Sequence, residues 1–129
     1  MKTVLITGAN TGIGFATAEA FLQDGHHVIL ACRNLEKAEV AKQQLEQMNT
    51  GKVDVIQLDL NSLQNVQDTA NQVIQKYEKI DILVNNAGLM TPTLESTAEG
   101  YEKQFGVNYL AHFLWTMKLL DVVKKSEQG

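Results

Sequence analysis

The most informative part of the sequence lies near its start and reads Thr7-Gly8-Ala9-Asn10-Thr11-Gly12-Ile13-Gly14. It follows residues 3–7, a short apolar run rich in β-branched residues, which is typical of a strand buried on both faces. After it, Ile13, Ala16 and Ala20 have the spacing of a helix. Three glycines between a strand and a helix predict a tight turn whose backbone N–H groups bind a phosphate anion.

The glycines follow the pattern G-x-x-x-G-x-G, which differs from the common dinucleotide-binding pattern G-x-G-x-x-G. Phe15 comes directly after the last of them, where a P-loop would need its lysine. A plain turn with a helix cap is the alternative, but it would need only one or two of the three glycines. We therefore favour a turn that binds the pyrophosphate of a dinucleotide.

Three more segments, 28–32, 53–58 and 81–85, have the same short apolar character as the first expected strand. Between them, segments 35–48 and 63–77 carry apolar residues at helical spacing. Alternating strands and helices predict a parallel sheet with right-handed crossovers. The expected fold is α/β, a Rossmann-like doubly wound parallel sheet with strand order 3-2-1-4, truncated after its fourth βα unit.

The segment after the fourth expected strand predicts a loop, a short helix over 96–104 and a long apolar helix over 105–123. Asn108, His112 and two charged residues interrupt the long apolar run. It therefore lacks the uncharged stretch of about 20 residues that a membrane span needs. We expect no membrane span and interpret the run as a buried or subunit-facing helix, in which His112 is a satisfied core or interface histidine.

Composition limits the class of protein. The 129 residues are 44% hydrophobic with one proline, which fits one globular domain, and the net charge of -4 predicts no nucleic-acid partner. Cys32 is the only cysteine and is interpreted as a small buried residue; together with the absence of a signal-like leader it predicts a cytoplasmic protein. His26 and His27 are expected in a polar turn, because no third ligand is spaced to complete a metal site.

The end of the second expected strand bears on the choice of cofactor. NAD-binding folds usually place an acidic residue there, about 20 residues after the glycines, to hold the ribose 2′-hydroxyl. This chain instead reads Cys32-Arg33-Asn34, and the Arg33 guanidinium suits a 2′-phosphate. NADP(H) is therefore preferred over NAD(H), although an ordinary solvated arginine would also explain Arg33.

Four motifs occur in a family-specific order: Thr7-Gly8-x-x-x-Gly12-Ile13-Gly14, Asp59-Leu60, Asn85-Asn86-Ala87-Gly88 and Asn108. With these motifs the chain resembles the N-terminal half of a short-chain dehydrogenase/reductase. The stretch 31–34 and the residues of the glycine turn further resemble the retinol dehydrogenase-like and protochlorophyllide reductase-like branch. The resemblance implies that residues 1–129 are the N-terminal, cofactor-binding part of a single Rossmann-like domain. The implied enzyme transfers hydride between a nicotinamide cofactor and an alcohol or carbonyl substrate.

The resemblance also implies roles for single residues. Asp59 and Leu60 would lie along the adenine, Asn86-Ala87-Gly88 would lie beside the ribose, and Asn108 would be the catalytic asparagine. With the glycine turn and the end of the second strand, the expected cofactor-binding residues are Thr7, Gly8, Asn10, Thr11, Gly12, Ile13, Gly14, Arg33, Asn34, Asp59, Leu60, Asn86, Ala87 and Gly88.

The rest of the family's catalytic set is not found in these residues. The family uses a serine and a Tyr-x-x-x-Lys pair, but Tyr77, Tyr101 and Tyr109 are not followed by lysine at that spacing. We therefore expect a fragment that is inactive alone, from an enzyme that forms a homodimer through helix 105–123 and later residues. The alternative is a non-enzymatic nucleotide-binding or protein-interaction module. A methyltransferase fits poorly, because it would want an acid after the second strand.

Overall fold

The computed structural model describes all residues from 1 to 129. Its four strands pair in parallel in the order β3-β2-β1-β4, which confirms the predicted α/β fold and strand order. The elements along the chain are β1 (Thr3–Thr7), α1 (Gly12–Gln23), β2 (His27–Cys32), α2 (Leu35–Glu46), β3 (Lys52–Gln57), α3 (Leu63–Lys76), β4 (Ile82–Val84), α4 (Lys103–Phe105), a π-helical turn η1 (Gly106–Leu110) and α5 (Ala111–Lys124).

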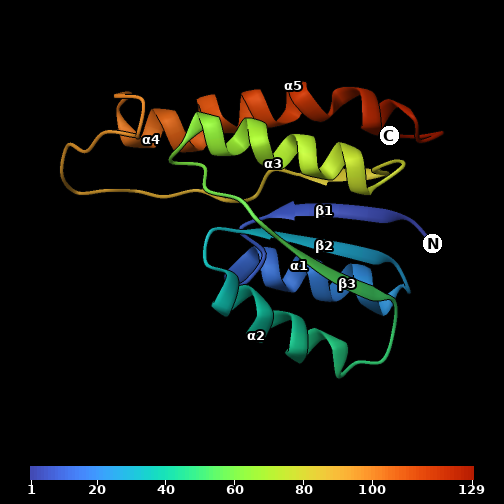
Figure 1. Ribbon diagram of the computed structural model, residues 1–129. Coiled ribbons are helices and arrows are strands. Elements are labelled where there is room, and N and C mark those ends of the chain that lie inside the picture. Colours follow the sequence, from blue (N-terminus) through green and yellow to red (C-terminus); the bar gives the residue numbers. More distant parts are fainter.

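The sheet is covered on both faces, as its apolar strands predict. Figure 1 shows α1 and α2 on one face and α3 and α5 on the other. Alternate residues of β1 enter the two cores: Val4 and Ile6 pack toward α1 and α2, whereas Leu5 packs toward α3 and α5. Full burial of such a side chain contributes about 1.5–3 kcal/mol, so the central strand anchors both layers.

The register of the sheet brings the ends of its strands to one edge. β1 pairs with β2 from Thr3 opposite His27, and with β4 from Val4 opposite Ile82. Because parallel strands have their carboxyl ends on the same edge, the segments that follow β1, β2, β3 and β4 meet there. These segments carry the glycine turn and the other motifs found in the sequence.

The face of α1 that packs on the sheet differs from the apolar face predicted from the sequence. Gly14, Ala18 and Leu22 are buried, whereas Ile13 and Ala20 are exposed. Small side chains on the buried face let α1 lie close to β1. In α3, by contrast, Val66, Ala70 and Val73 are buried, as expected, and Leu63 is partly buried.

The prediction of a polar turn at the two adjacent histidines was wrong for His27. This residue begins β2, and its Nε2 lies 2.9 Å from Asp54 Oδ2 on the neighbouring strand. The phenol of Tyr77 donates to the same carboxylate oxygen at 2.9 Å. A carboxylate from β3 therefore satisfies the buried ring, and this partner is distant in sequence.

The predicted short helix over 96–104 was also wrong. An antiparallel bridge between Ser96 and Glu102 closes this segment as a turn, and Gly100 has a φ of 87°. Such a positive φ interrupts a right-handed helix. The helix begins only at Lys103, where the carboxylate of Glu102 accepts from two N–H groups of the first turn.

The predicted long helix over 105–123 is confirmed, with a π-helical turn at its start. Its residues Ala111, Trp115, Leu119 and Val122 enter the core that α5 shares with α3 on one face of the sheet. None of the helices combines the length and hydropathy needed to cross a membrane.

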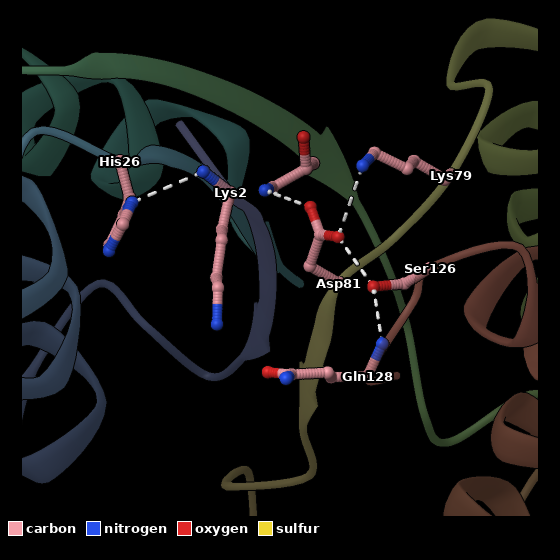
Figure 2. A network of polar contacts seen from close by, with 7 residues as sticks. Lys2, His26, Lys79, Asp81, Ser126 and Gln128 are labelled. Carbon is pink, nitrogen blue, oxygen red and sulfur yellow. Dashed lines mark hydrogen bonds and ion pairs between the residues drawn. The ribbon is translucent and has the colours of Figure 1, made fainter.

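The fourth strand, Ile82–Val84, is shorter than the expected segment 81–85, and Asp81 before it makes side-chain hydrogen bonds in addition to a backbone bond to Thr3. Asp81, before β4, accepts from the Thr3 N–H at 2.8 Å and from the Ser126 hydroxyl at 2.6 Å, with Lys79 Nζ at 3.5 Å (Figure 2). The carboxylate therefore joins the starts of β1 and β4 to the end of α5. The hydrogen bond from Ser126 is the main reason why the pKa of Asp81 is held below its usual value.

Replacing Asp81 with asparagine tests this junction. The substitution puts an NH2 group opposite a donor, so we expect a loss of about 1–3 kcal/mol in the free energy of unfolding at neutral pH, measured in urea. Because the pKa of Asp81 is lowered by folding, its contribution is present above the ordinary aspartate pKa and disappears as the pH falls through the folded-state pKa. The difference between the two proteins should therefore shrink in acid.

The matched control is Asp121→Asn, which changes an exposed carboxylate of α5 and should alter the free energy of unfolding by no more than about 0.5 kcal/mol. An Asp81→Asn protein as stable as the wild type at neutral pH would contradict the proposed junction.

Candidate functional site

A cleft of about 160 Å³ opens at the carboxyl edge of the sheet. It is lined by Gly8, Asn10, Ala31, Arg33, Leu58, Asp59, Leu60, Asn61, Ala87, Gly88, Leu89, Lys103 and Val107. Residues predicted from four separate segments thus meet in one cavity. They are Gly8, Asn10, Arg33, Asp59, Leu60, Ala87 and Gly88.

Two glycines allow the turn after β1 to lie directly against the segment after β4. Gly8 has a φ of 64°, and a Cβ there would lie 2.9 Å from the Cα of Ala87. A Cβ on Gly14 would lie 2.5 Å from Asn86 Nδ2 and 2.5 Å from the carbonyl oxygen of Gly8. All three distances are shorter than van der Waals contact, so each of the two positions can hold only glycine.

The start of α1 is prepared for an anion. Thr11 occupies the N-cap position, but no side chain caps the helix and no acid lies in its first turn. The N–H groups of that turn, around Gly12 and Ile13, therefore keep hydrogen-bonding capacity and carry the positive end of the helix dipole. Ile13 is 79% exposed beside them. This arrangement suits a pyrophosphate.

Asn86 holds the turn together and does not line the cleft. Its side-chain Nδ2 donates to the carbonyl oxygens of Thr7 at 3.0 Å and Gly8 at 3.2 Å. The backbone N–H groups of Asn86 and Ala87 donate to the hydroxyl oxygen of Thr7, each at 3.0 Å. The side chains of Thr7 and Asn86 are therefore used within the protein, which leaves Ala87 and Gly88 at the cleft surface.

The end of β2 presents an exposed cation to the cleft. Arg33 is exposed and lines the cavity, and no acid precedes Glu36 in the first turn of α2. Asn34 caps α2, because its Oδ1 accepts from the Lys37 N–H at 3.0 Å. The oxygen of Asn34 is thus occupied, whereas the guanidinium of Arg33 is free of intramolecular ion pairs.

An apolar wall with one carboxylate follows β3. Leu58 and Leu60 are buried, and Asp59 lies between them. Asp59 Oδ1 accepts from the Asn61 N–H at 3.0 Å, which leaves Oδ2 available to a donor in the cleft. An aromatic base with an exocyclic amine matches this combination of apolar surface and acceptor.

Asn108 lies in η1, outside the cavity lining. Its Oδ1 accepts from the Leu89 N–H at 2.9 Å, and its Nδ2 donates to the Leu89 carbonyl oxygen at 2.8 Å. The asparagine therefore anchors the loop that follows Gly88, and Leu89 in turn lines the cleft.

No tyrosine lies in the cleft. Tyr101 and Tyr109 are each about half exposed, and Tyr77 lies at the other end of the sheet beside His27. Burial, and to a lesser extent hydrogen bonding to Asp54, raises the pKa of Tyr77 above its ordinary value. None of the three tyrosines lines the cleft.

Sequence reasoning missed several residues of the cleft. Ala31, Leu58 and Asn61 lie next to predicted residues and could have been found by extending each motif. Lys103 and Val107 come from the start of the long helical segment, and Lys103 pairs with Glu95 at 3.5 Å. No local signal marks these two, because their place depends on how the helix packs. No group of three or more metal-ligating side chains is present.

Comparison with known proteins identifies the family. The family model for short chain dehydrogenases matches residues 2–129, so the chain belongs to the short-chain dehydrogenase family, as its motifs predicted. Among curated relatives, retinol dehydrogenase 13 of Mus musculus is 50% identical over 127 residues, which are 97% of this chain and 38% of that protein. Retinol dehydrogenase 14 of Homo sapiens is 41% identical and matches 97% of this chain and 41% of its own. The predicted retinol dehydrogenase-like branch is therefore confirmed.

Solved structures agree in fold. An alcohol dehydrogenase from Thermococcus sibiricus, complexed with 5-hydroxy-NADP, has a TM-score of 0.83 at 30% identity over 97% of this chain and 54% of that one. An uncharacterised protein from Mycobacterium paratuberculosis has a TM-score of 0.83 at 38% identity, over 95% of this chain and 42% of that one. The chain spans about two fifths of the length of the retinol dehydrogenases that it matches.

Replacing Gly14 with alanine tests the glycine cradle. The new methyl group would collide with Asn86 Nδ2 and with the Gly8 carbonyl oxygen, so the turn would separate from the segment after β4. We expect the affinity for NADP⁺, measured by calorimetry, to fall by more than about tenfold.

Gly25→Ala is the matched control. Gly25 has a φ of 79° with open space around its Cβ position and lies beyond the far end of α1. This variant should lose about 1–2 kcal/mol of stability through backbone strain but keep the wild-type affinity. A Gly14→Ala protein with unchanged affinity would refute the cradle.

Proposed function

We propose that residues 1–129 are the cofactor-binding part of an NADP(H)-dependent short-chain oxidoreductase. The observation that carries the proposal is the cleft in which the glycine turn, Arg33, Asp59 and Ala87 meet. When bound, the cofactor would supply the hydride that passes to or from an alcohol or carbonyl substrate. A lipophilic substrate of this class is supported by the names of the relatives, several of which are retinol dehydrogenases.

Each part of the cleft has a part of the cofactor to hold. The uncapped N–H groups at Gly12 and Ile13 would bind the pyrophosphate, and Asp59 Oδ2 would accept from the adenine amine. Ala87 and Gly88 would let the ribose approach the backbone closely. Asn108, the proposed catalytic asparagine, keeps the following loop in place through Leu89.

The preference for NADP(H) over NAD(H) rests on Arg33. Its planar, permanently charged guanidinium lines the cleft at the end of β2, where a 2′-phosphate would lie. No acidic residue stands at that position to accept from a ribose 2′-hydroxyl.

An Arg33→Ala variant separates the two cofactors. Loss of a charge-assisted contact should lower the affinity for NADPH by about tenfold or more and leave the affinity for NADH unchanged, as measured by fluorescence titration. Lys125→Ala, an exposed cation after α5, serves as the control and should change neither affinity. Equal losses for both cofactors, or none, would remove Arg33 from the proposal.

We further propose that the 129-residue chain binds cofactor without turning it over. General acid catalysis needs a proton donor near the reacting atoms, and none of the tyrosines lies in the cleft. With NADPH and retinal or a short aldehyde, we expect saturable binding but no steady-state loss of absorbance at the nicotinamide band. Sustained NADPH oxidation by the pure chain would overturn this proposal.

The alternative function is a non-enzymatic nucleotide-binding or protein-interaction module. The turnover experiment distinguishes the two functions when it is repeated with a longer chain that carries the family's serine and Tyr-x-x-x-Lys pair. The longer chain should oxidise NADPH if residues 1–129 are part of an enzyme, and should not if they form a non-enzymatic module.

For both functions we propose self-association through helix 105–123. Self-association is supported by a stripe of half-exposed apolar side chains, formed by Phe105, Tyr109, Phe113 and Met117.

We also propose a cytoplasmic location, supported by the single, buried and unpaired Cys32.

A further inference from the structure

His112 is a buried polar residue that the cofactor site does not use directly. It lies in the first turn of α5 with only 7% of its surface exposed, and it does not line the cleft. Its Nε2 lies 3.0 Å from the hydroxyl oxygen of Thr7, at the end of β1. The pair therefore connects α5 to the start of the glycine turn.

The hydroxyl of Thr7 determines which atom donates in this contact. A threonine hydroxyl has one proton to donate and two lone pairs to accept. Both lone pairs are taken by the backbone N–H groups of Asn86 and Ala87, each at 3.0 Å. The remaining proton must therefore point to His112 Nε2, which accepts it only when this nitrogen carries no hydrogen.

The other ring nitrogen of His112 then carries the proton in the neutral side chain. The backbone groups of Asn108 and Val107 act on the ring as well and favour its protonated form. Burial lowers the pKa of His112, and these two backbone groups oppose that effect only in part. The geometry and the shift both favour the neutral ring.

We propose that His112, as the neutral Nδ1–H tautomer, is a positioning residue that orients the Thr7 hydroxyl and so keeps the Asn86-Ala87 segment against the glycine turn. This inference rests on the cofactor-binding function proposed above. Without an acceptor at Nε2, the Thr7 hydroxyl would turn elsewhere, and its two bonds to the backbone would weaken. The cradle between Gly8 and Ala87 has no spare space, so a small shift would alter the cofactor site.

Protonation of His112 should have the same consequence as removal of its acceptor. A hydrogen on Nε2 would face a hydroxyl oxygen whose lone pairs are already used. The charges of the neighbouring elements lie elsewhere: β1 and β4 have none, and η1 has only the half-exposed phenol of Tyr109. In α3 the charged residues Asp68 and Lys76 are exposed, and in α5 the nearest charge is Lys118, six residues along. His112 is therefore the group expected to control this junction in mild acid.

Two variants of His112 separate the hydrogen-bond acceptor at Nε2 from the packing of the side chain. His112→Leu removes the acceptor and should lower the affinity for NADP⁺ by about tenfold, whereas His112→Gln can place Oε1 near the position of Nε2 and should stay within about threefold of the wild type. Calorimetry on the 129-residue chain, with a thermal melt of each protein, gives both affinity and folding. Equal affinities of wild type and a folded His112→Leu protein would overturn the proposal, as would a His112→Gln protein as weak as the leucine variant.

The pH profile provides the readout that a purely structural residue would not move. As the pH falls below the ordinary histidine pKa of about 6.5, the wild-type affinity should fall more steeply than that of His112→Gln, because only the wild type can gain a proton at this position. The 2′-phosphate also titrates near pH 6, so NAD⁺ is measured in parallel as a ligand without that group. Parallel profiles of the two proteins with both ligands would overturn the proposal.

Nitrogen NMR of His112 in the ligand-free chain tests the inference independently of cofactor binding. The expected spectrum at neutral pH has a protonated Nδ1 and a bare Nε2, and a protonated Nε2 would overturn the proposal. If this tautomer is present but neither the wild type nor either His112 variant binds NADP⁺ or NAD⁺ at any pH, the cofactor-binding function is refuted. The positioning role, which rests on that function, is then refuted as well.

Discussion

The hydroxyl oxygen of Thr7 joins the first βα unit to the fourth, and the cleft depends on that junction. It accepts from the backbone of Asn86 and Ala87, while the Asn86 side chain donates back to the carbonyl oxygens of Thr7 and Gly8. These bonds replace the backbone ladder that ends with Val84 in β4. The two segments are pressed so closely that a side chain at Gly8 or Gly14 would separate them.

Carboxylates and backbone N–H groups lie at both ends of the sheet, but they have partners within the protein at one end and free hydrogen-bonding capacity at the other. At the amino end, Asp81 is occupied by a backbone N–H, a hydroxyl and a lysine, and Asp54 by a histidine and a phenol. At the carboxyl edge, Asp59 keeps one oxygen free and the first turn of α1 is uncapped. Polar groups that are satisfied internally stabilise the fold, whereas unsatisfied ones are available to a ligand. The free oxygen of Asp59 and the uncapped first turn of α1 therefore support the carboxyl edge as the candidate site.

Much of this arrangement could be predicted, because it follows from local patterns. Short apolar runs separated by helical segments lead to a parallel sheet, and parallel strands bring the glycine turn, Arg33 and Asp59 to one edge. Predictions failed where one residue or a distant partner overrode the pattern. Gly100, with its positive φ, lies in a turn where a helix was expected, and backbone pairing with β1 and β3 places His27 in a strand where a turn was expected.

The order of strands, the glycine turn after β1 and the family follow from patterns among neighbouring residues, so the sequence alone was sufficient to predict them. The entry of Lys103 and Val107 into the cleft, the anchoring of Leu89 by Asn108 and the pairing of Thr7 with His112 were visible only after folding. Thr7 and His112 stand 105 residues apart, and their contact depends on how α5 packs against α3 and the sheet. Hydrogen bonds between distant segments have no periodicity in the sequence, because they are set by the relative placement of whole elements.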